Sequence, residues 1–484
     1  MPVQPKLRSL KGPRRHGRRT LRSVAVWSAT VALSLIGAVS PQAHPARADT
    51  PKPNIVFILT DDQRWRTLWA MPNTRRLLVR HGVMFTNAFV VNSLCCPSRS
   101  SILTGQYSHS TGVYSNTGQY GGWQAFRPHE ASTIAVWLKN AGYDTALIGK
   151  YLNGYSGTTE IPPGWDRWFA WETGSGGFFY NYTINDNGAL RFYGSDPSDY
   201  STRVLTREAV SFIDHAQSPF FLYLALYAPK NGVPDPRDAS AFPDLKPYRP
   251  PNYNEADVSD KPAWVQNLPP LTRWRRAAED RRRLDQYRTL LGADRAVRHV
   301  VHALNLRGEL NRTMIVFTSD NGLAWGEHRW TNKLSPYEES IRVPYVVRYD
   351  PLTQLPRPDS HLVTNIDLAP TWADLAGIAA PGAEGTSLLP LLSSPFAHWR
   401  SDFLVEHLQN HDPIPTYCAV RNERYMYVAY GTGEKELYDL SADPFELRNR
   451  EADGTLASVR NHMWRRLKSL CKPPPPGYTV PPSP

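Results

Sequence analysis

The chain has 484 residues, of which 41% are hydrophobic and 11% are aromatic. This composition excludes a largely disordered chain and predicts one domain of catalytic size together with a smaller one. Of the formal net charge of +11, nine charges come from residues 1–48, which hold no Asp or Glu. The remainder has 46 basic and 44 acidic residues, so its charge gives no reason to expect binding to nucleic acid.

Residues 1–48 have the pattern of an export signal, in which basic residues precede an apolar run (24–39) and small residues follow it. The run is short for a membrane span. We therefore expect cleavage after Ala48 and an exported protein, secreted or in the cell envelope, without stable membrane insertion. The paired Arg18 and Arg19 resemble a twin-arginine signal, and an ordinary secretory (Sec) signal explains them equally well.

Along the rest of the chain, short apolar runs alternate with helical patterns. The runs typical of buried strands are 54–60, 144–149, 220–228 and 313–319. Helical patterns include 132–142, capped by Ser132 and ended by Gly142, and 281–308. This alternation predicts an α/β fold whose mostly parallel sheet is covered by helices on both faces. The proline-rich stretch 231–272 predicts a long surface loop that is functional or disordered.

We predict four parts along the chain. They are the export signal (1–48), a catalytic domain (51–385), a smaller C-terminal α+β subdomain (386–472) and a proline-rich tail (473–484) without core-forming residues. Cys418 and Cys471 are expected to form a disulfide in an oxidising compartment. The adjacent Cys95 and Cys96 pair poorly with each other, and the sequence has no Cys/His pattern with zinc spacing.

Polar residues follow two of the predicted strands. Asp61 and Asp62 come after 54–60, and Asp320 and Asn321 come after 313–319. In an open α/β sheet the carboxyl ends of the strands form the ligand site, and calcium prefers oxygen ligands of this kind. Each pair alone is equally typical of a turn, but their joint placement predicts a calcium site.

Three lysines follow strands at the same predicted edge. They are Lys150, Lys230 and Lys333. A single lysine after a strand is usually a solvated charge, whereas three beside a metal suit a tetrahedral anion such as sulfate or phosphate.

Cys95 lies just before a predicted helix start. Ser98 or Ser100 serves as the cap of this helix, and Pro97 lies just ahead of it. The positive end of a helix favours an anionic nucleophile and an anionic substrate. The residues alone leave two interpretations open. Cys95 is a thiolate nucleophile whose pKa is lowered by Arg99, or it is a buried structural thiol.

The segment "SLCCPSRSSILTG" resembles the sulfatase family, whose signature is C-x-P-S-R followed by two variable residues, two apolar residues and T-G. Further family segments span Pro53 to Asn449, among them "PNIVFILTDDQ", "GYDTALIGKYLNGY", "TMIVFTSDNGLAWGEH" and "ELYDLSADPFELRN". "GKYLNGY" and "FYNYTINDNG" look most like the branch that acts on N-acetylglucosamine 6-sulfate in glycosaminoglycan degradation. The resemblance implies an alkaline-phosphatase-like, mixed but mostly parallel sheet sandwiched by helices, with a smaller C-terminal α+β subdomain.

The resemblance also implies a chemistry. Cys95 would be oxidised by a formylglycine-generating enzyme to Cα-formylglycine, whose hydrate attacks sulfur with one hydroxyl and releases sulfate with the other. The residues that would hold one calcium ion are Asp61, Asp62, Asp320 and Asn321, with the modified Cys95. Those that would act in catalysis are Arg99, Lys150, Lys333, Lys230 and His328. The substrate would be a sulfated carbohydrate or an aryl sulfate.

Two positions depart from the family pattern. The usual histidine after the Gly-Lys pair is Leu152, and the usual Ala-Pro-His reads Ala-Pro-Lys, with Lys230 in the histidine position. An ammonium is a poorer acid at neutral pH unless its pKa is depressed. Lys230 and Leu152 therefore leave open an inactive protein that binds sulfated glycans. A phosphodiesterase or phosphonate hydrolase of the same superfamily is a further alternative, because phosphoryl and sulfuryl groups are both tetrahedral and need similar binding sites. His109 is assigned to structure.

Overall fold

The computed structural model describes residues 52–174, 176–353 and 355–483, and these form one compact unit. The predicted export signal lies outside the described residues. No helix within the described ranges is long and apolar enough to cross a membrane.

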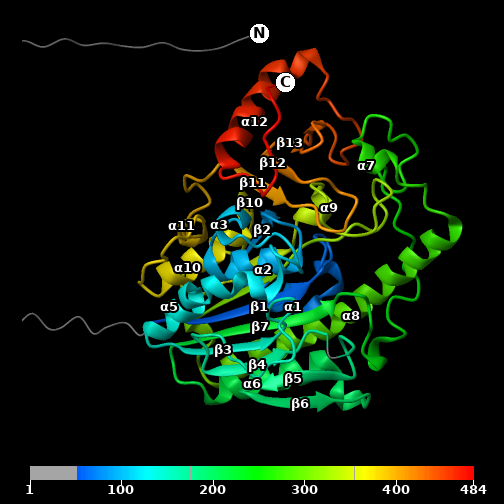
Figure 1. Ribbon diagram of the computed structural model, residues 1–484. Helices are drawn as coiled ribbons and strands as arrows, with labels where there is room; N and C mark the ends of the chain where they lie inside the picture. Colours follow the sequence, from blue (N-terminus) through cyan, green and yellow to red (C-terminus); the bar gives the residue numbers. More distant parts are fainter. Residues whose placement is uncertain (1–51, 175, 354, 484) are drawn as a thin grey trace, which may run out of the picture. The chain divides into compact units, whose positions relative to one another are not determined.

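A ten-stranded mixed sheet forms the centre of this unit (Figure 1), with the order β10-β2-β9-β8-β1-β7-β3-β4-β5-β6. Its strands are β1 (Asn54–Asp61), β2 (Val83–Phe89), β3 (Asp144–Gly149), β4 (Arg167–Trp171), β5 (Tyr182–Asp186), β6 (Ala189–Tyr193), β7 (Phe220–Pro229), β8 (Thr313–Ser319), β9 (Tyr345–Arg348) and β10 (Arg357–Thr364). The neighbours β8, β1, β7, β3 and β4 are parallel, whereas β9 and β5 run antiparallel to their neighbours. This arrangement confirms the predicted fold class.

Helices cover both faces of the sheet. The helices before the C-terminal part are α1 (Pro72–Leu77), α2 (Cys95–Thr104), α3 (Ser108–Thr111), α4 (Gly122–Phe126), α5 (Ile134–Asn140), α6 (Ser201–His215), α7 (Ala263–Gln266), α8 (Arg273–Leu306), α9 (Glu338–Ile341), α10 (Leu368–Leu375) and α11 (Leu389–Ser393). Of these, α7 and α9 pack with residues of the C-terminal part (403–438) instead. In β1, Phe57 belongs to the core that includes α2, α5 and α10, and Ile58 belongs to the core that includes α6 and α8. Because both faces are covered, β1 reads as a continuous apolar run.

The four predicted strands are present, and the helix predicted at 281–308 begins earlier, at Arg273. Its N-cap is Thr272, whose side chain accepts a hydrogen bond from the backbone N–H of Arg275. Ser132 does not cap α5, because the N-cap is Thr133. The stretch 231–272 is mostly irregular but contains the short helix α7. It is not an isolated loop, because it packs against the segment that follows β8.

A second, antiparallel sheet and a long helix lie beyond β10 and β2 (Figure 1). Its strands are β11 (Asp402–His407), β12 (Tyr417–Asn422), β13 (Tyr425–Tyr430) and β14 (Lys435–Asp439), and the helix is α12 (Ala457–Leu470). The predicted Cys418–Cys471 disulfide joins β12 to the end of α12. The prediction that the tail contributes nothing to a core is wrong, because Tyr478 packs into this core and donates a hydrogen bond to the carbonyl oxygen of Ala429.

Candidate active site

The carboxyl ends of β1 and β8 bring the predicted acidic residues together. Thr60 pairs with Ser319 in the parallel ladder, so the residues after these strands become neighbours. The backbone N–H of Asp62 donates to Asp320 Oδ1 over 3.1 Å, and Asn321 Nδ2 donates to Asp62 Oδ1 over 2.7 Å. Asp62 has a φ of 62°, the left-handed conformation that aspartate tolerates better than most residues. The four residues are buried and form one oxygen-rich edge.

The predicted cations lie at the same edge, because β3 and β7 end beside β1. Lys150 follows Gly149, the last residue of β3, whose φ of 116° suits glycine. A side chain at Gly149 would lie 2.0 Å from the carbonyl oxygen of Ala225, so only glycine lets β3 end here. Lys230 follows Pro229 at the end of β7, and Pro229 is paired with Asp61. The sheet thus places both lysines beside the first acidic corner.

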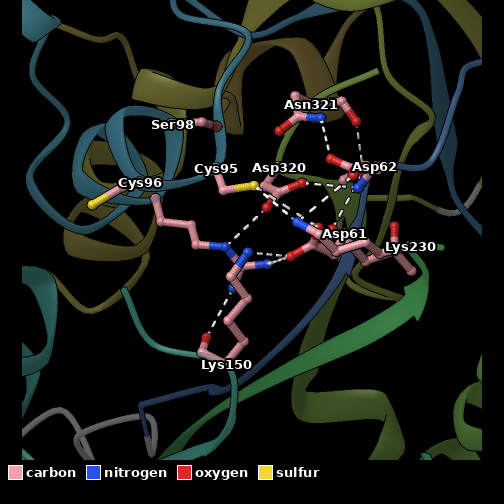
Figure 2. A network of polar contacts seen from close by, with 12 residues as sticks. Asp61, Asp62, Cys95, Cys96, Ser98, Lys150, Lys230, Asp320 and Asn321 are labelled. Carbon is pink, nitrogen blue, oxygen red and sulfur yellow. Dashed lines mark hydrogen bonds and ion pairs between the residues drawn. The ribbon is translucent and has the colours of Figure 1, made fainter. Parts of the chain in front are cut away.

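Each predicted cation contacts a carboxylate of this edge (Figure 2). Arg99 donates from Nε to Asp320 over 2.9 Å and from Nη2 to Asp61 over 3.2 Å. Lys150 forms a short ion pair with Asp61, and Lys230 Nζ lies 3.1 Å from Asp61 Oδ1. Lys333 Nζ lies 2.6 Å from Asp62 Oδ1.

The sulfur of Cys95 lies where these groups meet. It is 2.6 Å from Lys333 Nζ, 3.5 Å from Lys230 Nζ and 3.9 Å from Asp61 Oδ1. Figure 2 shows the Cys95 side chain directed at the carboxylates, whereas the sulfur of Cys96 points away into the core. Burial raises the pKa of the Cys96 thiol to about 12, so this neighbour stays protonated and unreactive.

The start of helix α2 differs from the prediction. The helix begins at Cys95, its N-cap is Leu94, and no side chain caps it. Ser100 instead donates to the carbonyl oxygen of Cys96, and Ser98 Oγ accepts from Asn365. Cys95 therefore lies in the first turn of α2, which is the positive end of the helix, as predicted.

The predicted link between Arg99 and the sulfur takes another form. The guanidinium hydrogen-bonds to two carboxylates and to the carbonyl oxygen of Lys150 (2.8 Å), while the two ammonium groups contact the sulfur. Arg99 therefore orders the acidic edge and the end of β3 rather than the thiol itself.

The charged groups of the site shift one another's pKa. Burial opposes ionisation of Asp61, but Lys150, Lys230, Arg99 and Lys333 hold the pKa of Asp61 well below its usual value. Burial alone would lower the pKa of Lys230, but the carboxylates of Asp61 and Asp62 raise it. The resulting pKa is well above the usual lysine value. In this arrangement Lys230 is an ammonium ion.

The residues present fit a calcium ion. Three carboxylates and one amide oxygen, all hard donors, lie together at the sheet edge, and Asp61, Asp62 and Cys95 each offer an atom within 4.8 Å of the others. Burial and the neighbouring Asp61 raise the pKa of Asp320.

His328 is not brought into this site, so its assignment as a catalytic residue is corrected. Its Nδ1 lies 2.7 Å from Glu255 Oε2, its Nε2 lies 3.3 Å from Asn252 Nδ2, and its ring packs on Tyr337 at 4.3 Å. Glu255 and Asn252 come from the stretch 231–272, whose partnership with the segment after β8 the sequence did not reveal. The histidine orders the loop that carries Lys333.

The histidine also belongs to a second buried acidic group, formed with Glu339 and Glu446. The amide of Asn252 donates to Glu339 Oε1 over 3.1 Å, and Arg64 Nη2 lies 3.6 Å from the same atom. Hydrogen-bond donors of the protein therefore already occupy part of this group.

Other residues singled out in the sequence serve packing. Leu152 is buried in the core between the sheet and α5, and Trp168 and Trp171 are buried as well. The aromatic rings that do reach the site were not predicted. Lys150 lies 5.4 Å from the ring centre of Tyr227, and Lys230 lies 5.8 Å from that of Phe178. No sequence pattern distinguished these rings from core aromatics.

Two family models match the chain. Residues 53–378 match the model described as Sulfatase, and residues 326–473 match the model described as N-sulphoglucosamine sulphohydrolase, C-terminal. Together they cover the described unit almost completely.

Known proteins are similar over most of this length. The N-acetylglucosamine-6-sulfatase of Homo sapiens is 33% identical over an alignment of 480 positions, which covers 88% of this chain and 86% of that protein. The extracellular sulfatase SULF-1 homolog of Drosophila melanogaster is 35% identical over an alignment of 373 positions, which covers 73% of this chain. The chain spans about a third of the length of that relative, 33%.

A solved structure is similar to this chain over most of its length. It is that of a protein in complex with its substrate D-glucosamine-2-N,6-O-disulfate, with a TM-score of 0.76 and 25% sequence identity. The similarity covers 87% of this chain and 98% of that chain.

Proposed function

We propose that this chain, which belongs to the sulfatase family of sulfuric ester hydrolases, releases sulfate from sulfated sugars of the N-acetylglucosamine 6-sulfate class. The observation that carries the proposal is the buried Cys95 sulfur, which contacts two ammonium groups and lies beside an acidic edge. The similar proteins named for N-acetylglucosamine 6-sulfate and solved with a glucosamine disulfate support the substrate class.

Cys95 is proposed to act after oxidation to Cα-formylglycine. The hydrated aldehyde would supply one hydroxyl that attacks sulfur and a second that lets sulfate leave, which a thiol does not provide. Asp61 is placed to accept a proton from the group at position 95, and its cationic neighbours keep it ionised. Arg99 and Lys150 act through Asp61, because both bond to its carboxylate.

Lys333 and Lys230 are proposed to bind the sulfate. Both ammonium groups contact the sulfur at position 95, so they are placed to neutralise oxygens of a sulfuryl group bound there. Lys333 is the nearer of the two and is proposed to assist the departing oxygen through its positive charge. Lys230 serves as an anion-binding residue in the position where the family has histidine.

Calcium is proposed to be held by Asp61, Asp62, Asp320 and Asn321. When bound, it supplies positive charge to the sulfate oxygens and to the group at position 95. The chain's own contribution is to hold these four oxygen donors together through the register of β1 with β8 and the hydrogen bonds between their corners.

The proposal has two cellular corollaries. The protein is exported, as the names of extracellular sulfatases among its relatives support. Its obligatory partner before export is a formylglycine-generating enzyme, which recognises the segment around Cys95.

The test is to express the chain together with a formylglycine-generating enzyme, determine the mass of the peptide that contains Cys95, and measure sulfate release from N-acetylglucosamine 6-sulfate. We expect an aldehyde at Cys95, turnover of the sulfate ester, and a loss of more than about a thousandfold in Cys95→Ala. Cys96→Ala is the matched control and is expected to keep most of the activity. An unmodified thiol in a folded, inactive protein would contradict the proposal.

Two assays run in parallel, one with an aryl phosphodiester and one with an aryl sulfate, test the phosphodiesterase alternative. Faster turnover of the phosphodiester would replace the proposed reaction with that alternative. Because sulfuryl and phosphoryl groups are both tetrahedral anions, the two substrates are compared at equal concentration in the same protein preparation.

A further inference from the structure

A basic groove runs along the outer side of helix α8, away from Cys95. Two cavities of about 380 Å³ and 610 Å³ adjoin there, because His299 lines both. We call them together the α8 groove. Its charged lining residues are Arg203, Arg207, Arg237, Arg295, Asp235, Arg76, Arg298, Arg348, His81, His299 and His302.

The charge of this lining is one-sided, since it contains seven arginines and one carboxylate. That carboxylate, Asp235, already accepts hydrogen bonds from Arg203 and Arg237. Burial and the positive charges around it, of which Arg298 is the largest, lower the pKa of His299. Two carboxylates next to the lining, Asp238 and Asp350, pair with Arg295 and Arg348. The positive charge left in the groove is that of the arginines without such a partner.

Three of its arginines have no carboxylate within ion-pair distance among the described residues. They are Arg76, Arg207 and Arg298, and all three are exposed. Arg76 donates only to Asn73, Arg207 only to the carbonyl oxygen of Ser198, and the contact of Arg298 is with His299. Guanidinium groups that are solvated and unpaired are available to an anionic ligand, and their planar fork suits oxyanions.

The unpaired positive charges come from three helices that line the groove. Arg76 belongs to α1, Arg207 to α6 and Arg298 to α8, whereas Arg295 is paired with Asp238. Three separate guanidinium groups along two adjoining cavities match an extended polyanion better than a single small anion. Apart from the histidines, the one aromatic ring among the described lining residues is that of Tyr200, which is buried, so the groove presents no exposed Tyr, Phe or Trp ring on which nucleic-acid bases stack.

The groove is remote from the reacting group. Arg282, in the first half of α8, acts electrostatically on Asp62 at the site. Arg298 lies sixteen residues further along the helix, or about 24 Å along its axis. One sugar unit does not reach both places, whereas a chain of sulfated sugars does.

We propose that the α8 groove is a second binding site for linear sulfated polysaccharide, which holds the polymer while a sulfated unit reacts elsewhere. The proposal rests on the proposed function for the identity of the anion, sulfate carried on a sugar chain. It concerns affinity for the polymer and not the chemical step.

The test uses the full exported chain and a column of immobilised heparin as the sulfated polysaccharide. The variant Arg76→Gln/Arg207→Gln/Arg298→Gln removes the three unpaired charges with a residue of similar helix propensity. Its matched control, Arg465→Gln/Lys468→Gln/Lys472→Gln, removes three exposed charges from α12 and the residue beyond Cys471. We expect the groove variant to elute at lower salt and its binding to release about two to three fewer counterions, with the control unchanged.

Activity supplies a second readout. Hydrolysis of a sulfated monosaccharide is expected to stay within about twofold in the groove variant, while kcat/KM for a sulfated polymer falls about tenfold. Equal elution of both variants from the column would overturn the proposal. So would a groove-dependent affinity for single-stranded RNA as high as that for heparin at the same salt concentration. If no sulfate ester is hydrolysed but heparin binding still depends on the groove, the proposed function is wrong and the proposed binding site is supported.

Discussion

Two buried polar centres take residues from the segment after β8, but their charges are balanced in opposite ways. At the Cys95 centre, Asp61, Asp62 and Asp320 face the cations Arg99, Lys150, Lys230 and Lys333. At the His328 centre, the carboxylates Glu255, Glu327 and Glu339 face Arg64 and Lys261. The first centre has an excess of positive charge, and the second has an excess of negative charge.

This difference indicates what each centre does. A surplus of cations that contact one sulfur atom is suited to receive an anion from outside. At the His328 centre, burial and the neighbouring Glu327 raise the pKa of Glu339, which favours a bound proton over the surplus negative charge there. The Cys95 centre is built for a ligand, and the His328 centre supports the loop that carries Lys333.

Among the changes that test this comparison, removing calcium from the Cys95 centre should have the largest effect. Treatment with a chelator is expected to lower sulfate release more than about a hundredfold, because several kilocalories per mole of charge stabilisation are lost. Added Ca²⁺ should restore activity better than Mg²⁺, which demands a stricter octahedral geometry. Full activity in protein shown by elemental analysis to be metal-free would contradict this assignment.

Lys230 sharpens the comparison within the Cys95 centre. Lys230→Ala is expected to lower kcat/KM for an aryl sulfate about 10- to 100-fold, because one anion-binding ammonium is lost. Lys230→His is expected to keep the activity or raise it, since the family has histidine there. A large loss in Lys230→His would show that the lysine has a role that histidine does not fill.

His328 tests whether the two centres are separate. His328→Ala leaves Glu255 without one of its buried partners, so we expect the free energy of unfolding to fall by about 2–3 kcal/mol in a urea titration. The activity of the folded fraction should fall less than about tenfold. If kcat falls as far as in Lys230→Ala while stability is unchanged, the distinction between the centres is wrong.

The smallest effect concerns His109, which links α3 to β11. Burial disfavours the protonated ring of His109, but the carboxylates of Glu384 and Glu406 favour it. Together they raise the pKa of His109 from 6.5 to about 10. Because the folded pKa is the higher one, its contribution to stability is fully present below pH 6.5 and is lost as the pH rises to about 10. His109→Gln should therefore cost about 1–2 kcal/mol at pH 6 and nothing measurable near pH 10.5.

The comparison also explains which parts of the molecule could be predicted from the sequence. The strands β1, β3, β7 and β8 are buried on both faces, so each appears as an uninterrupted apolar run. The strand β6 is largely exposed and β10 contains Pro358, so neither has a recognisable pattern.

The site residues divide in the same manner. Asp61, Asp320, Lys150 and Lys230 follow predicted strands, and the rule that ligands gather at strand ends was enough to group them. His328 also follows such a strand, but its partner Glu255 comes from an irregular stretch with no periodicity. Partnerships made by loops depend on tertiary packing, which a local pattern does not encode.

The complete burial of Cys95 sets an order of events during biosynthesis. Once α2 has packed on the sheet, no part of this side chain is accessible to another protein. If Cys95 is converted to formylglycine, the converting enzyme has to reach it while the chain is still being made or is unfolded. Folding and modification then compete in time, and a variant that folds faster would yield a larger share of stable, unmodified and inactive protein.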